Sequence, residues 1–259
     1  MFTTPVGYRM IASNIDAALA RTANTPNVRR DSEYYLSKIS NIDTVEQFLA
    51  DDRVYQLAMR AHGLDDMIYA KAFMRKVLTE GIDDKSSFAN SLVDTRFREF
   101  AATFNFARYG ETATTFTKAQ QGTVDNYIRQ TLEATEGEAN QGIRLALYFE
   151  RKAPQVASTY SLLADRALLK VTQVALGLPE QSAALDIDRQ VELIEKKLNV
   201  ADLKDPSKLE RLLTRFAALW EIDNPTTTAA LAPNLIVGGN GGIFDAALLA
   251  QMQNTRSGY

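Results

Sequence analysis

Helix start and stop signals follow one another along this chain, and they restrict its fold more than any other feature of the sequence. Thr44 and Gln47 have the spacing of a capping box, in which two side chains accept hydrogen bonds from backbone N–H groups that are free at a helix start. Asp205 before Pro206 is a second start signal, because proline has no N–H that the first turn would leave free. Between such signals apolar residues recur every three or four positions, and no stretch sustains the two-residue alternation of strands. The sequence therefore predicts an all-α protein, folded as an irregular multi-helix bundle.

Other helix boundaries can also be predicted at single residues. Thr117 and Gln120 have the capping-box spacing, and they predict the start of a helix that ends at Gly137. Asp65 is expected to open a further helix, in which Tyr69 belongs to the apolar residues that recur every three or four positions.

One phrase occurs three times: a short apolar lead-in, an acidic residue, an arginine within two positions, and an amphipathic run. The copies are FLADDRVYQLAMRAHGL (48–64), SLVDTRFREFAATFNF (91–106) and LLADRALLKVTQVALGL (162–178). We interpret each copy as a corner at which an aspartate caps the second of two helices and the arginine reaches back to a carboxylate or a carbonyl. The expected caps are Asp52, with Asp51 as the alternative, Asp94 and Asp165. Because the copies are unequally spaced, they predict repeated helix–corner–helix units rather than a stacked solenoid.

Composition excludes several classes of function. The formal net charge is −3 at pH 7, which gives no electrostatic basis for binding nucleic acid. Cysteine is absent and His62 is the one histidine, so thiolate catalysis, cysteine-based zinc sites and two-histidine metal sites are excluded within one chain. No apolar stretch approaches the roughly 18 residues of a membrane span. The start of the chain does not have the order of a secretory signal peptide. We expect no metal, no cofactor and no membrane span.

Carboxylates are the remaining candidates for chemistry. The pairs Asp65–Asp66 and Asp83–Asp84 could hold a metal or act as acid and base, but both lie where helix starts favour acidic residues. Glu136, Glu138 and Glu150 could serve an all-α glycosidase, which needs two carboxyl groups about 5–10 Å apart. We favour helix caps for the aspartates and solvated helix faces for the glutamates, and catalytic residues are expected to be none.

Three further patterns have a structural reading. His62 precedes Gly63 at a helix end, where an imidazole can bond to a free carbonyl. The aromatic series Phe97, Phe100, Phe104 and Phe106 has helical spacing and predicts core residues. The stretch LIVGGNGGIFDAALLAQM (235–252) resembles a nucleotide-binding turn but lacks its third glycine and a phosphate-binding lysine, so we interpret it as a hinge before a helix.

The two ends differ from the body of the chain. Residues 1–30 contain one acidic residue, Asp16, and are expected to be partly helical. Residues 31–224 form the predicted helical domain, and residues 225–259 a Gly/Pro-rich linker followed by an amphipathic helix. Its apolar residues Phe244, Leu248 and Met252 are the candidate partner-binding residues, because so short a helix needs something to pack against.

Four segments together resemble a known family. They are FLADDRVYQLAMRAHGLDDMIYAKAFMRKVLTEG, SFANSLVDTRFREFAATFNFARYG, ADRALLKVTQVALGLP and DPSKLERLLTRFAALWEIDN. They resemble the bacterial domain-of-unknown-function family 1217 over roughly residues 31 to 224. The resemblance implies a helical domain whose genes tend to lie among flagellar genes, and it implies no catalytic residues.

These observations lead to a hypothesis about function. We expect a non-enzymatic helical accessory or interaction protein of the bacterial flagellar system, with a protein partner. It is expected in the cytoplasm, with export or association with the flagellar apparatus left open. The alternatives are a peptidoglycan-directed hydrolase that uses paired carboxylates, and a cytoplasmic regulatory protein. Paired carboxylates in a cleft would favour the hydrolase, and an exposed apolar surface would favour the interaction protein.

Overall fold

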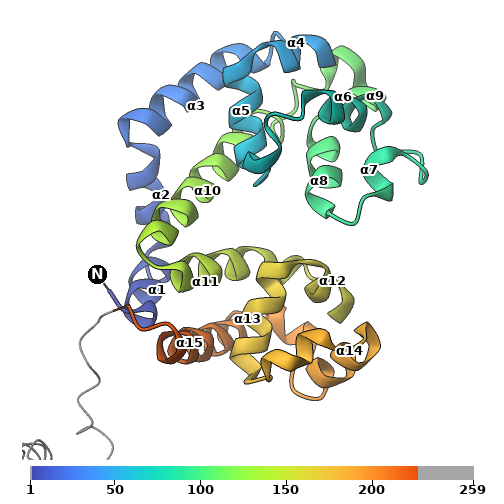
Figure 1. The fold of residues 1–259 in the computed structure, drawn as a ribbon. Helices are drawn as coiled ribbons and strands as arrows, with labels where there is room; N and C mark the ends of the chain where they lie inside the picture. Colours follow the sequence, from blue (N-terminus) through green and yellow to red (C-terminus); the bar gives the residue numbers. More distant parts are fainter. Residues whose placement is uncertain (1, 227–259) are drawn as a thin grey trace, which may run out of the picture. The chain divides into compact units, whose positions relative to one another are not determined.

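The structure, a computed structural model, describes residues 2–226 and contains helices but no strand within that range (Figure 1). The all-α prediction is therefore confirmed. The candidate residues Phe244, Leu248 and Met252 lie outside the described residues.

A first hydrophobic core is formed by the chain between Val28 and Tyr127. Its helices are α3 (Pro26–Ile39), α4 (Val45–Ala50), α5 (Asp52–Ala61), α6 (Lys71–Glu80), α7 (Phe88–Ser91), α8 (Thr95–Thr103), α9 (Phe106–Tyr109) and the first half of α10 (Gln121–Ala139), with short 3-10 helices at Asp65–Met67 and Gly110–Thr112. The aromatic series is part of this core, since Phe97, Phe100, Phe104 and Phe106 are all buried.

A second core combines the first helices of the chain with the later ones. They are α1 (Thr4–Ala12), α2 (Ile15–Ala23), α11 (Gln141–Lys152), α12 (Thr159–Ala164), α13 (Arg166–Leu176), α14 (Ile187–Glu195) and α15 (Pro206–Asp223), with 3-10 helices at Ala153–Gln155, Glu180–Ala184 and Val200–Lys204. The long helix α10 serves both cores, because Val124 and Tyr127 pack in the first and Leu132 in the second. In Figure 1 it leads from the neighbourhood of α5 to α11.

Most of the capping predictions are confirmed. The Thr44 hydroxyl accepts from the Gln47 N–H and the Gln47 side chain accepts from the Thr44 N–H, which completes the capping box of α4. Asp205 caps α15 with Pro206 in the first turn. The chain leaves α5 through Gly63, whose φ of 69° lies in the left-handed region that favours glycine.

Two predicted helix starts are wrong. The helix expected after Thr117 begins four residues later at Gln121, because the preceding turn packs into the core: Ala119 is fully buried and its carbonyl accepts a hydrogen bond from Tyr35. Asp65 opens only a 3-10 turn, and Tyr69 is 83% exposed rather than part of a buried face. In both places tertiary packing overrides the local signal.

The first and third copies of the repeated phrase form the same corner. Asp51 caps α5 and accepts a hydrogen bond from Tyr34, while Asp165 caps α13 and accepts one from Tyr148. In each corner the tyrosine precedes the aspartate by 17 residues and lies on the preceding long helix, α3 or α11. The expectation that Asp52 is the cap is wrong, because Asp51 holds that position.

The second copy makes a different corner. Asp94 caps α8 as predicted, by accepting from the Arg96 N–H. The Arg96 guanidinium donates back to the same carboxylate and to the carbonyl oxygen of Gly63. This arginine thereby ties the start of α8 to the end of α5, as the phrase predicts.

Close helix approach places α1 against α11 and α15. A Cβ atom at Gly142 would lie 2.4 Å from Trp220 Cδ1 and 2.6 Å from Thr4 Cγ2, which are distances that real Cβ atoms do not show. The backbone of α11 can therefore come this near to its two neighbours only because residue 142 is glycine.

We expect Gly142→Ala to lower the free energy of unfolding by about 1–3 kcal/mol, the usual cost of overpacking a filled site. Gly137→Ala in α10 is the matched control, because the three atoms nearest to its methyl group all belong to the side chain of Arg144, which can shift, and alanine favours a helix. Urea unfolding of both variants measures the difference. Equal stability of Gly142→Ala and the native protein would show that these helices are not in close contact.

Candidate functional site

A cavity of about 470 Å³ lies between α1, α11 and α15, beside the 3-10 helix Val200–Lys204. This volume is within the range of small-ligand sites, roughly 300–1,000 Å³. Part of its wall is apolar, with Leu203, Leu209 and Ala217 among the lining residues. Its polar side chains are Tyr8, Arg9, Ser13, Glu150, Lys204, Glu210 and Thr214.

The start of α1 is fixed by polar contacts with the end of α15. The N–H and the hydroxyl group of Thr4 both donate to Glu221 Oε2 at 2.7 Å, and the hydroxyl also lies 3.1 Å from Asn140 Oδ1. Asn140 in turn caps α11 through the N–H groups of Gly142 and Ile143. Because Thr4 is fully buried, these contacts hold α1 in place and define one wall of the cavity.

Glu150 on α11 is the least exposed charged group of the cavity wall. Its Oε2 atom is buried and has no hydrogen-bond partner among the described residues, and Arg129 Nη2 lies 3.7 Å away, beyond hydrogen-bond range. The side chain is 33% exposed, so Oε1 is the oxygen that keeps contact with open space. Burial raises the pKa of the Glu150 carboxyl, Arg129 opposes the rise, and the charges of Glu133 and Glu210 add to it.

Arg129 is not free to satisfy Glu150, because a buried ion cluster uses its guanidinium. Its Nε donates to Glu133 Oε1 at 3.0 Å and its Nη2 to the Leu147 carbonyl at 3.1 Å. Arg151 completes the cluster with two hydrogen bonds to the Glu133 carboxylate, at 2.8 and 2.9 Å. Glu133 is 1% exposed, so this cluster is part of the second core. Two arginines and one glutamate leave the cluster with an excess of one positive charge, and Arg129 brings that charge close to Glu150.

The other charged groups of the wall are exposed and have no ion-pair partner among the described residues. They are Arg9 on α1, Lys204 and Glu210. Glu210 contributes to the raised pKa of Glu150, which places the two carboxyl groups within electrostatic reach of each other. Burial and the charges of Glu150 and Glu210 raise the pKa of the Tyr8 hydroxyl, so Tyr8 also lies within electrostatic reach of both carboxyl groups.

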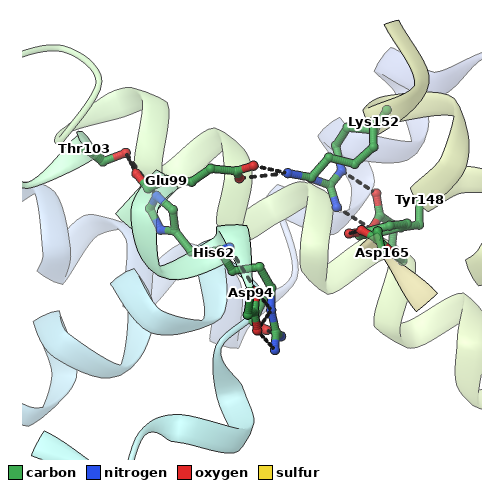
Figure 2. A network of polar contacts seen from close by, with 11 residues as sticks. His62, Asp94, Glu99, Thr103, Tyr148, Lys152 and Asp165 are labelled. Carbon is green, nitrogen blue, oxygen red and sulfur yellow. Dashed lines mark hydrogen bonds and ion pairs between the residues drawn. The ribbon is translucent and has the colours of Figure 1, made fainter. Parts of the chain in front are cut away.

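His62 lies in another part of the fold and is held in a structural role. Its Nδ1 donates to the Ala58 carbonyl at 2.9 Å, and Nε2 lies 3.1 Å from Thr103 Oγ1 (Figure 2). The ring packs edge-on against Phe100, and burial lowers its pKa to about 4. An imidazole that is neutral at pH 7 and bonded on both nitrogens fits the helix-end role that the sequence predicts.

A polar bridge starts beside His62 and joins helices of the two cores. Glu99 on α8 receives two hydrogen bonds from Lys152 on α11, at 2.8 and 3.0 Å, as Figure 2 shows. Tyr148, one helical turn before Lys152, points to Asp165. The bridge connects α8 to α11 and α11 to the start of α13, and its residues are not among those that line the cavity beside Glu150.

The remaining candidate carboxylates are dispersed. Asp83 pairs with Arg108, and Asp84 accepts from the N–H and hydroxyl groups of Ser86. Asp65 and Asp66 lie 3.5 and 3.7 Å from arginines on α5 and α8. In the described part of the chain no three Asp, Glu, His or Cys residues gather as a metal would require. Of the three glutamates singled out in the sequence, Glu150 alone lines the cavity.

The sequence reasoning missed the partners of Glu150. Arg9 lies near the start of the chain and Lys204 and Glu210 well after Glu150, and none has a motif around it. Tyr8 is a buried aromatic residue of α1, and nothing in the sequence around it indicates that it lines a cavity. Only the packing of α1 and α15 against α11 brings these residues together.

The described part of the chain is thus an all-α protein with two helical cores and a cavity whose inner wall is acidic. Within residues 2–226 no helix has the length and apolar character needed to cross a membrane. The chain belongs to the DUF1217 family of proteins of unknown function, whose family model matches residues 61–209.

A solved relative has the same fold. The crystal structure of protein AGR_C_984 from Agrobacterium tumefaciens, a structural-genomics target, is 48% identical in sequence and superposes with a TM-score of 0.80. The match covers 86% of this chain and 94% of that one. No curated protein matches the sequence.

Proposed function

We propose that this chain is a non-enzymatic helical interaction protein of the bacterial flagellar system. The observation that supports an interaction role is that α1 has apolar side chains on two faces. Its inner face, with Tyr8 and Ile11, is buried in the second core. Its outer stripe, defined as Phe2, which precedes the helix, with Val6 and Met10 on the helix, is 58%, 48% and 56% exposed.

The outer stripe has the spacing of a docking surface. Val6 and Met10 are four positions apart on α1, so they lie above one another along one side of the helix, and Phe2 precedes the helix. Leaving three large apolar side chains in water forgoes roughly 25 cal/mol for every Å² that a partner could cover. Exposed apolar side chains that gather in one place are typical of protein–protein contact, and we propose that this stripe serves one.

The flagellar setting of the proposal rests on the family alone. Members of this family tend to be encoded among flagellar genes, and we propose a partner from the flagellar apparatus for that reason. The chain would meet its partner in the cytoplasm or after export.

The proposal predicts that capture of a flagellar protein from motile cells depends on the outer stripe. The double variant Val6→Glu with Met10→Glu should lose the captured protein while its thermal unfolding stays close to native. Ile187→Glu is the matched control, because Ile187 is a similarly exposed apolar residue (60%) on α14. Capture that survives in the double variant would remove the stripe from the interface, and capture of no flagellar component would remove the flagellar setting.

A second candidate function is supported by Glu150 and Glu210. A glycoside hydrolase needs at least two carboxyl groups at its active site, one of them with a raised pKa, and this cavity contains such a pair. This would make the chain a peptidoglycan-directed hydrolase. We favour the interaction role because Arg9 and Lys204 share the wall and give the cavity no excess of negative charge. Release of peptidoglycan fragments by the native protein, lost in Glu150→Gln, would reverse that preference.

A further inference from the structure

We propose that the cavity between α1, α11 and α15 receives a basic side chain, arginine or lysine, which the partner presents among apolar side chains. This inference rests on the interaction role proposed above and names the chemistry that its partner must carry. Three features of the cavity lead to it: an unsatisfied carboxylate, a neighbouring second carboxylate, and apolar walls.

The first feature is the hydrogen-bond deficit of Glu150. A carboxylate can accept about four hydrogen bonds, and Glu150 accepts none from the described residues. Arg129, the nearest cation, already donates to Glu133 and to Leu147 and lies 3.7 Å from Oε2. Oε2 is buried, so a group outside the fold cannot reach it, whereas Oε1 is accessible and is the oxygen to which an outside donor can bond. A guanidinium or an ammonium supplies such donors together with the opposite charge.

The second feature is the depth at which each charge lies. Glu150 is two-thirds covered, whereas Arg9, Lys204 and Glu210 are exposed. Charges in water are screened, and a partly buried charge interacts more strongly because the effective dielectric constant is lower. The inner end of the cavity is therefore acidic despite two cations on its wall. Glu210 lies close enough to act on the same bound cation, because its charge already acts on Glu150.

The third feature is the apolar wall and the helix α1, which carries residues of both the cavity and the outer stripe. Leu203, Leu209 and Ala217 can cover the methylene chain of a lysine or an arginine, whose charged end then reaches Glu150. Arg9 and Ala12 line the cavity from α1, which is also the helix that carries Val6 and Met10. One partner segment could thus insert its basic side chain into the cavity and lay its apolar residues along the outer stripe.

The proposal is tested with a synthetic peptide of defined chemistry. The probe is an acetylated, amidated five-residue peptide with a central arginine between leucines, and its control has citrulline, a neutral isostere, in place of arginine. Both are titrated into the ¹⁵N-labelled full-length protein while backbone amide shifts are followed. We expect saturable shifts at Tyr8, Ala12 and Glu150 with the arginine peptide, and at least tenfold weaker binding of the citrulline peptide, which corresponds to about 1.4 kcal/mol.

Variants of the protein assign the effect to one carboxylate. Glu150→Gln keeps the size of the side chain and removes its charge, so the arginine peptide should bind at least tenfold more weakly. Glu138→Gln, an exposed change outside the cavity, should bind it as the native protein does. Equal binding of the two peptides, or full binding by Glu150→Gln, would overturn the proposal.

The outcomes separate this inference from the interaction role itself. If the peptide fails to bind while capture from cells still depends on Val6 and Met10, the stripe is an interface and the cavity takes no basic residue. If the peptide binds and capture is independent of the stripe, the cavity site stands alone. Circular dichroism and thermal unfolding of Glu150→Gln test whether this variant is folded. Glu210→Gln is a second binding variant, and we expect it to weaken binding of the arginine peptide to a smaller degree.

Discussion

Replacing Glu133 with alanine is expected to lower the free energy of unfolding by about 3–5 kcal/mol, the usual effect of removing one partner from a buried ion pair. Glu133 is 1% exposed and accepts hydrogen bonds from both Arg129 and Arg151. Its removal leaves two guanidinium groups, 14% and 20% exposed, without their main counter-charge. Chemical denaturation with urea measures the loss.

Glu99→Ala is the matched control for this prediction. Glu99 also forms a doubly hydrogen-bonded ion pair, with Lys152, but its own side chain is 47% exposed. Exposed pairs of this kind contribute about 0–1 kcal/mol. Similar losses in the two variants would show that burial of the Glu133 cluster does not govern its energy. Partial compensation in Glu133→Ala by rearrangement of Glu150 toward Arg129 would appear as a changed pKa of Glu150.

The second large effect is a loss of stability in mild acid that depends on His62. Burial lowers the pKa of His62 from 6.5 to about 4, so between these values the unfolded chain binds a proton that the folded protein does not. By linkage the free energy of unfolding must fall as the pH falls through this window, and the loss attributable to His62 is about 2 kcal/mol between pH 7.5 and pH 5. Urea unfolding at a series of pH values measures it.

His62→Gln isolates this contribution because glutamine does not titrate. The variant is expected to be less stable at pH 7.5, since it loses the ring contacts with Phe100 and Phe104. Its stability should nevertheless change by less than the native protein's between pH 7.5 and pH 5. Parallel pH profiles for the two proteins would mean that the imidazole is accessible to protons in the folded state.

Local signals predicted those parts of the fold that depend on neighbours in sequence. The capping box at Thr44, the cap at Asp94 and the start of α15 at Asp205 are correct, because a cap is made between a side chain and N–H groups two or three residues away. The buried aromatic series is correct for a similar reason, since helical spacing puts Phe97 and Phe100 toward one side of α8, and Phe104 follows at the C-cap of that helix.

Where two local readings compete, distant residues decide between them. Asp51 and Asp52 are equally good caps on sequence grounds, and Asp51 holds the position in a corner that Tyr34 joins from α3. Thr117 and Gln120 fulfil the capping-box pattern, yet the helix starts later because the turn before it is buried, with Ala119 bonded to Tyr35. A hydrogen bond across 84 residues has no signature in a local window.

The sequence by itself determined that this chain is helical, that helices begin after Thr44, Asp94, Asp165 and Asp205, and that the chain has no cysteine and one histidine, because each of these depends on residue type or short-range spacing. Only the tertiary structure decided that the corners at Asp51 and Asp165 are built alike, that His62 is neutral, and that Glu150 faces a cavity. The cavity is assembled from α1, α11 and α15, three segments that meet through side-chain packing and through Thr4, Asn140 and Glu221. Desolvation and unsatisfied hydrogen bonds are properties of that assembly, and a linear chain does not have them.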